Sequence, residues 1–117
     1  MIAKEDILEL LKSTESYRVE RTVSTGNMDK FCEAICAFAN DMPGSRKNGY
    51  LIIGAKDNGS IAGMKVDDAL LKKIAGIRSD GNILPLPTMS VERISFPEGD
   101  VLVAEVKPSD LPPVRYR

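Results

Sequence analysis

Residues 49–55 form a short run that, as an extended strand, would present apolar or small side chains on both faces. Between Tyr50 and Ala55 every residue is apolar, aromatic or glycine, with no polar alternation. Such a run is typical of an interior strand that is covered on both faces. Residues 57–59, Asp-Asn-Gly, tolerate the positive φ angles of a tight turn. We therefore predict that residues 61–64 return antiparallel, as the second strand of a hairpin.

The segment before this strand has the spacing of a helix that needs cover over much of its circumference. Asn27 is the predicted N-cap, and Asp29 lies in the favourable first turn. Cys32 and Cys36 are four residues apart on this helix, poorly placed for an unstrained disulfide, and are expected to pack in the core. The apolar stripe that we expect to lie against the sheet is Phe31, Ala34, Ile35, Phe38 and Ala39.

The remaining segments predict a fold of the α/β (α+β) class: a mixed, mostly antiparallel sheet packed with about three helices. Pro85 and Pro87 make residues 83–87 an extended connector that stays out of the sheet. The chain forms one domain, 1–117, and stops in the middle of a strand pattern, so we expect an N-terminal fragment of a longer protein. Further helices are predicted at residues 2–12 and 66–78, and further strands at 17–23, 89–96, 101–106 and from 114 onward.

The charge balance limits the function classes. Sixteen basic and seventeen acidic residues leave a net charge of −1, which argues against a nucleic-acid binder that works by overall charge but not against a local basic face. The sequence contains no histidine, which excludes Ser-His-Asp and Cys-His catalysis and histidine-containing zinc sites. No apolar run is long enough to cross a bilayer, and the first residues do not form a signal peptide. We expect a cytoplasmic location and no membrane partner.

Several short motifs resemble, in their order and spacing, the Schlafen AlbA-like domain, also called the divergent AAA domain. The resemblance extends over residues 2–117 and is strongest over residues 34–63. The motifs are Glu15-Ser16, Val19-Glu20-Arg21, CAFAN at 36–40, GYLIIG at 49–54, DNG at 57–59 and IAG at 61–63. The resemblance implies an AlbA-like fold and a module at the N-terminus of bacterial and archaeal transcriptional regulators and RecG-related proteins. Such modules are thought to bind DNA or RNA.

The resemblance also implies a candidate catalytic cluster. In vertebrate members a related fold cleaves structured RNA through carboxylates, and by position these would be Glu15, Glu20 and Asp57. Two or three carboxylates with open positions suit Mg²⁺ or Mn²⁺. Alternatively, Glu15 ends a helix, Glu20 is a solvated strand residue and Asp57 belongs to a turn. Arg21 and Lys56 stand where the family usually has Phe and a second acid, which weakens the nuclease hypothesis.

A candidate phosphate-binding face consists of basic residues on or beside the segments that the central strand joins. Arginine and lysine at such places position nucleic acid through its backbone. Alternatively, these charges are scattered over the surface and serve solubility. No Gly-x-x-x-x-Gly-Lys-Ser/Thr pattern is present, so ATP is not an expected cofactor. The five candidates are Arg18, Arg21, Arg46, Lys47 and Lys56.

Three functions follow from these patterns. The leading hypothesis is a DNA- or RNA-binding module of a transcriptional regulator, without a cofactor. The second is a metal-dependent endoribonuclease that uses the carboxylates. The third is a protein-interaction module that forms homo-oligomers, which the near-zero net charge and a predicted unpaired sheet edge favour.

Overall fold

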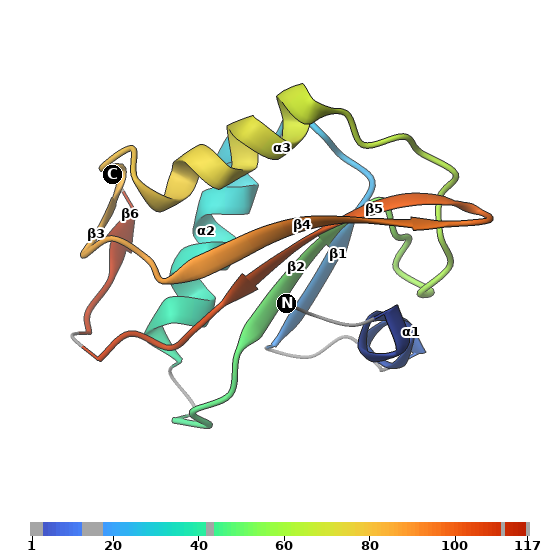
Figure 1. Cartoon of the computed structure of the whole chain (residues 1–117). Coiled ribbons are helices and arrows are strands. Elements are labelled where there is room, and N and C mark those ends of the chain that lie inside the picture. The colour runs from blue at the N-terminus through green and yellow to red at the C-terminus, as the bar shows by residue number, and fades with distance from the viewer. Residues whose placement is uncertain (1–3, 13–17, 42–43, 111, 117) are drawn as a thin grey trace.

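The computed structural model describes residues 4–12, 18–41, 44–110 and 112–116. Three α-helices, a short 3₁₀ helix and six strands follow one another in the described parts of the chain (Figure 1). None of the described helices is long and apolar enough to cross a membrane. In chain order, the elements are α1 (Lys4–Lys12), β1 (Val19–Thr22), α2 (Met28–Asn40), β2 (Gly49–Ile53), α3 (Asp68–Ala75), η1 (Gly76–Arg78), β3 (Ile83–Leu84), β4 (Met89–Phe96), β5 (Gly99–Val106) and β6 (Arg115–Tyr116).

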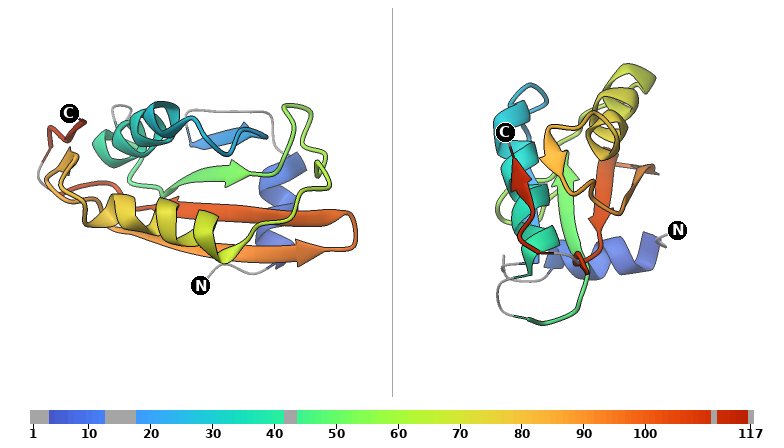
Figure 2. Two further views of the ribbon diagram at one scale, coloured as in Figure 1. Left: turned by 90° about the horizontal axis from the view of Figure 1, so that it is seen from above. Right: turned by 90° about the vertical axis from the view of Figure 1, so that its left-hand side faces the viewer.

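Four strands form the main sheet in the order β1-β2-β5-β4. β1 and β2 are parallel, whereas β5 is antiparallel to both β2 and β4. β4 and β5, with eight residues each, form a long hairpin (Figure 2). The predicted mixed, mostly antiparallel sheet with about three helices is confirmed.

Different helices cover the two faces of the sheet. Leu51 and Ile53 of β2 pack with α2 and α3 in one apolar cluster. Ile52, between them, packs on the other face with Ile7 and Leu11 of α1, and Figure 1 shows α1 across the sheet from α2. The prediction that β2 is an interior strand, covered on both faces, is confirmed.

The predicted cap Asn27 is present, and Asp67 caps α3 in the same way. The Asn27 side chain accepts a hydrogen bond from the Lys30 N–H at 3.2 Å. The Asp67 side chain accepts from the Leu70 N–H at 2.8 Å at the start of α3. Each cap satisfies a backbone donor that the helix leaves unpaired.

Two predictions about the connections need correction. The return strand over residues 61–64 is wrong: only Ala55 and Ile61 form an isolated antiparallel bridge. A strand cannot add beside β2, because β1 occupies one edge of β2 and β5 the other. The proline-containing connector does stay out of the main sheet. Its first residues, however, form β3, which pairs with β6 in a separate two-stranded ladder.

Hydrogen bonds join Val114 and Tyr116, near the C-terminus, to α2. The Asn40 amide donates to the Val114 carbonyl at 2.9 Å, and its side-chain oxygen accepts from the Val114 N–H at 2.7 Å. Cys36 Sγ donates to the same carbonyl at 3.0 Å. The Tyr116 hydroxyl donates to the Asp29 carboxylate, and this bond raises the pKa of Tyr116 to about 12. These contacts fix the path of the chain that follows β5.

The cysteines on α2 take the places that were predicted for them. Cys32 belongs to the core, and Cys36 is half-buried; both are free thiols. Burial raises the pKa of each thiol above its ordinary value. Both side chains therefore stay protonated at neutral pH.

The closest approach of α2 to the sheet depends on a glycine. A Cβ atom at Gly49 would lie less than 3.0 Å from three atoms of the Phe38 side chain, which is itself buried. The Gly49→Ala substitution is therefore expected to lower the free energy of unfolding by about 1–3 kcal/mol, because the ring has to move within a packed core. Urea unfolding followed by circular dichroism measures this change.

Gly76→Ala is the matched control. Gly76 has helical dihedral angles (φ −63°, ψ −24°), and nothing lies within 4 Å of an added Cβ atom. This substitution is expected to leave stability unchanged or to raise it by up to about 1 kcal/mol. Equal unfolding midpoints for the two variants would contradict the packing described for α2.

Candidate nucleic-acid interface

One end of the main sheet gathers chain segments that are distant in sequence. Because β1 and β2 are parallel, Arg18 before β1 and Asn48 before β2 lie at the same end, and Arg18 Nε donates to the Asn48 carbonyl at 3.4 Å. β5 runs the opposite way, and its last residue, Val106, lies opposite Gly49 of β2. Lys107 is therefore brought to this end as well.

A single carboxylate shapes the loop between α2 and β2. Asp41 ends α2 in a left-handed conformation (φ 45°). Its side chain accepts from the Arg46 N–H at 2.7 Å, from the Ser45 N–H at 3.1 Å and from the Ser45 hydroxyl at 2.9 Å. These bonds, the Arg46 N–H foremost, hold the pKa of Asp41 below its ordinary value.

Arg46 itself has a left-handed backbone (φ 60°). That conformation is uncommon for a residue with a side chain and persists only where the surroundings impose it. The Asp41 carboxylate supplies that constraint. It therefore fixes the point from which the Arg46 side chain extends.

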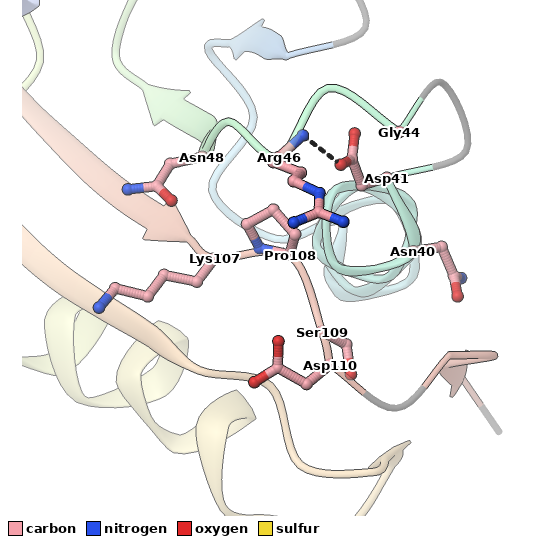
Figure 3. Close-up of a pocket in the computed structure, with 9 residues that line it drawn as sticks. All are labelled: Asn40, Asp41, Gly44, Arg46, Asn48, Lys107, Pro108, Ser109 and Asp110. Carbon is pink, nitrogen blue, oxygen red and sulfur yellow. Dashed lines mark hydrogen bonds between the residues drawn. The ribbon is translucent and has the colours of Figure 1, made fainter.

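A depression of about 580 Å³ opens at this end (Figure 3). The exposed side chains of Arg46 and Lys107 extend in different directions at its border. Of its two carboxylates, Asp41 is engaged by the loop, and Asp110 lies on the opposite side. We call this hollow the basic depression; it is lined by Asn40, Asp41, Gly44, Arg46, Asn48, Lys107, Pro108, Ser109 and Asp110.

The five predicted basic residues do not share one face. Arg18, Arg46 and Lys47 lie at the end of the sheet that holds the basic depression. Lys56 follows β2 and lies at the opposite end, so its predicted place on the same face is wrong. Arg46 and Lys47 precede β2 and Lys56 follows it, and the parallel pairing of β1 and β2 places Arg18 with the first two.

Arg21 is also not part of an exposed face, because only 4% of its surface is accessible. Its guanidinium Nη1 donates to the Leu10 carbonyl at 3.4 Å, and Nη2 donates to the Asp57 carbonyl at 3.0 Å. A cation near the last turn of a helix also complements the helix dipole. Arg21 therefore joins α1 to the turn after β2.

The carboxylates of the nuclease hypothesis are only partly placed. Glu15 lies outside the described residues. Glu20 forms an ion pair with Lys30 of α2 at 3.6 Å, and Asp57 lies in the turn after β2. Among the residues that the structure describes, no three Asp, Glu, His or Cys side chains are grouped as metal ligands. The metal site therefore stays a prediction that depends on Glu15.

Two residues at the end of the sheet that holds the basic depression were not identified from the sequence. Lys107 is not among the predicted basic residues, although its place directly after the predicted strand 101–106 was the available signal. Asp41 is not among the predicted site residues either. Its spacing of four and five residues from Ser45 and Arg46 resembles a capping turn, in which a carboxylate accepts from backbone N–H groups.

The role of Asp41 can be tested by titration. Since the folded-state pKa of Asp41 is depressed, its contribution is present above the ordinary value of 3.8 and is lost as the pH falls through the lower folded value. The amide resonances of Ser45 and Arg46 are expected to titrate together, with a midpoint below 3.8, in ¹⁵N–¹H spectra. In Asp41→Asn this transition should be absent. A midpoint at or above 3.8 would contradict the contacts described.

Comparison with known proteins agrees with this architecture. The N-terminal domain of a RecG-related protein, named for ATP-dependent DNA helicases, from Nitrosomonas europaea has a similar solution structure, with a TM-score of 0.68 and 22% sequence identity. The match covers 100% of this chain and 88% of that domain. None of the curated proteins compared matches the sequence significantly.

The family model described as Schlafen, AlbA_2 matches residues 15–117, which is nearly the whole chain. The sequence motifs, the mixed sheet with three helices and this match agree with one another. The chain belongs to the Schlafen AlbA_2 family.

Proposed function

We propose that this domain binds nucleic acid through the phosphate backbone, at the end of the sheet that holds the basic depression. The observation that carries the proposal is the convergence of cations from three separate segments at that end: Arg18 before β1, Arg46 and Lys47 before β2, and Lys107 after β5. Arginine and lysine side chains position nucleic acid by contacting phosphates.

The local charge matters here more than the net charge of −1. The acid nearest to Arg46 in the chain, Asp41, is already engaged with two backbone N–H groups and a hydroxyl. It therefore competes less for a phosphate-binding guanidinium than a free carboxylate would. About four phosphate contacts correspond to a slope of log K against log salt near −3.

Membership in the Schlafen AlbA_2 family and the fold shared with a RecG-related N-terminal domain support a nucleic-acid-related role. The finer proposal is that the domain serves as the DNA- or RNA-contacting module of a larger transcriptional regulator. The contacts proposed involve no base-specific partner and no nucleotide cofactor. The metal-dependent nuclease and the homo-oligomer stay predictions, because the described residues provide no specific observation in favour of either.

The Arg46→Gln/Lys107→Gln double variant tests the proposed site. It is expected to weaken the binding of labelled oligonucleotides about tenfold at low salt and to reduce the slope from about −3 to about −1.5, because two phosphate contacts are lost. Fluorescence anisotropy across a salt series measures both quantities.

The Lys12→Gln/Lys72→Gln double variant is the control, because it removes the same charge from exposed positions on α1 and α3. Its binding should stay close to that of the unaltered protein. If both double variants weakened binding equally, or if affinity did not change with salt, the proposed interface would be rejected.

A further inference from the structure

A second depression, of about 410 Å³, adjoins the basic depression. Residues 107–110 line both hollows and so lie between them. On the far side, its wall is formed by the proline-containing segment before β4. We call this hollow the apolar depression; besides residues 107–110 it is lined by Ala39, Pro85, Leu86, Pro87 and Thr88.

The segment between the two hollows is held in place from both sides. The Lys107 N–H donates to the Thr88 carbonyl at 2.9 Å, and the Ser109 N–H donates to the Ala39 carbonyl at 2.7 Å. Since one bond leads to the β4 side and the other to α2, residues 107–110 form a fixed partition. The two hollows therefore keep a constant position relative to each other.

The apolar depression presents a large apolar side chain to solvent. Leu86 is 53% exposed and stands between Pro85 and Pro87. The two prolines restrict the backbone on either side of Leu86, so this side chain projects from a stiff stretch of chain. Five of the nine residues that line the hollow are apolar, and the other four are polar or charged. A hollow of this size is within the range of small-molecule sites.

The charged side chains at and beside residues 107–110 determine which ligand groups each hollow can accept. Arg46 lines only the basic depression, whereas Lys107 and Asp110 border both. The Asp110 carboxylate repels a phosphate but accepts hydrogen bonds from N–H groups at the edge of a base. Because Asp110 borders both hollows, the difference between them lies elsewhere: Arg46 makes the basic depression the better phosphate site, and residues 85–87 give the other hollow an apolar wall that a base can contact.

From this arrangement we propose that the ligand is a single-stranded nucleic acid, bound with a phosphate in the basic depression and a neighbouring unstacked base in the apolar depression against Leu86. This inference rests on the proposed function. In a duplex the faces of the bases are stacked and closed to apolar side chains, whereas a single strand offers them.

The test compares three labelled probes by fluorescence anisotropy: a mixed-sequence DNA strand of about twelve nucleotides, its duplex, and an abasic strand of the same length and charge. The single strand is expected to bind at least fivefold more tightly than the abasic strand, because only the strand places a base on the apolar wall. The duplex should also bind more weakly than the strand.

Variants then locate the contact. Leu86→Ala should weaken binding of the single strand about fivefold, through the loss of apolar contact, and leave the abasic strand unaffected. Leu84→Ala is the matched control, because Leu84 is similarly exposed (43%) but lines neither depression. Asp110→Ala should reduce the preference for the strand over the abasic probe, since it removes the acceptor for a base, and should tighten the binding of both probes alike through the lost repulsion of phosphate.

The outcomes separate this inference from the proposed function. If Arg46→Gln weakens all probes while strand, duplex and abasic strand bind equally and Leu86→Ala has no effect, the single-strand inference is overturned and backbone binding stands. If no probe depends on Arg46, the proposed function fails and the inference fails with it. If the protein prefers the single strand over the abasic strand, and this preference is lost in Leu86→Ala but kept in Leu84→Ala, the result supports both the proposed function and the single-strand inference.

Discussion

The packing of α2 on β2 determines where the rest of the chain goes. Phe38 lies over Gly49, at the start of the strand, where no side chain would fit beneath the ring. The end of the helix is thereby held above the start of the strand, and Ser45 and Arg46 of the loop between them are hydrogen-bonded to Asp41. Arg46 is placed by this contact, although it takes no part in it.

The direction of the strands determines which residues meet. The parallel pair β1 and β2 places Arg18 beside the loop before β2, and the antiparallel β5 adds Lys107 from far along the chain. At the opposite end, the Arg21 guanidinium donates hydrogen bonds to backbone carbonyls of α1 and of the turn after β2. The two ends of the sheet therefore differ in chemistry: one gathers Arg18, Arg46, Lys47 and Lys107 from three segments, and the other, beside the exposed Lys56, uses its arginine to hold the structure together.

The sequence was informative wherever local patterns determine structure. The apolar run of β2, the stripe of α2 and the cap Asn27 could all be predicted, because periodicity and cap chemistry are short-range properties. The motifs of the family were likewise recognisable from their order. The hypothesis of a local basic face also came from the sequence, and three of its five residues lie at one end of the sheet.

Two errors were local: Asp41 has its contacts within its own loop, and Lys56 follows β2 whereas Arg46 precedes it. The others concern long-range relations: that Arg18 lies with Arg46 depends on the direction of β1, which no local pattern fixes. The burial of Arg21 depends on where α1 ends relative to the turn after β2. A return strand at residues 61–64 was excluded by β5, whose place beside β2 could not be read from its own residues. Lys107 entered the site for the same reason.

The central claim is that nucleic acid binds at the end of the sheet built by α2, β2 and β5. Titration of the ¹⁵N-labelled domain with a short single-stranded oligonucleotide tests it most directly. We predict that the amide resonances of residues 44–48, 107, 109 and 110 shift, while those of residues 56–59 at the opposite end stay in place. Shifts confined to residues 56–59 and to Lys30 would contradict it.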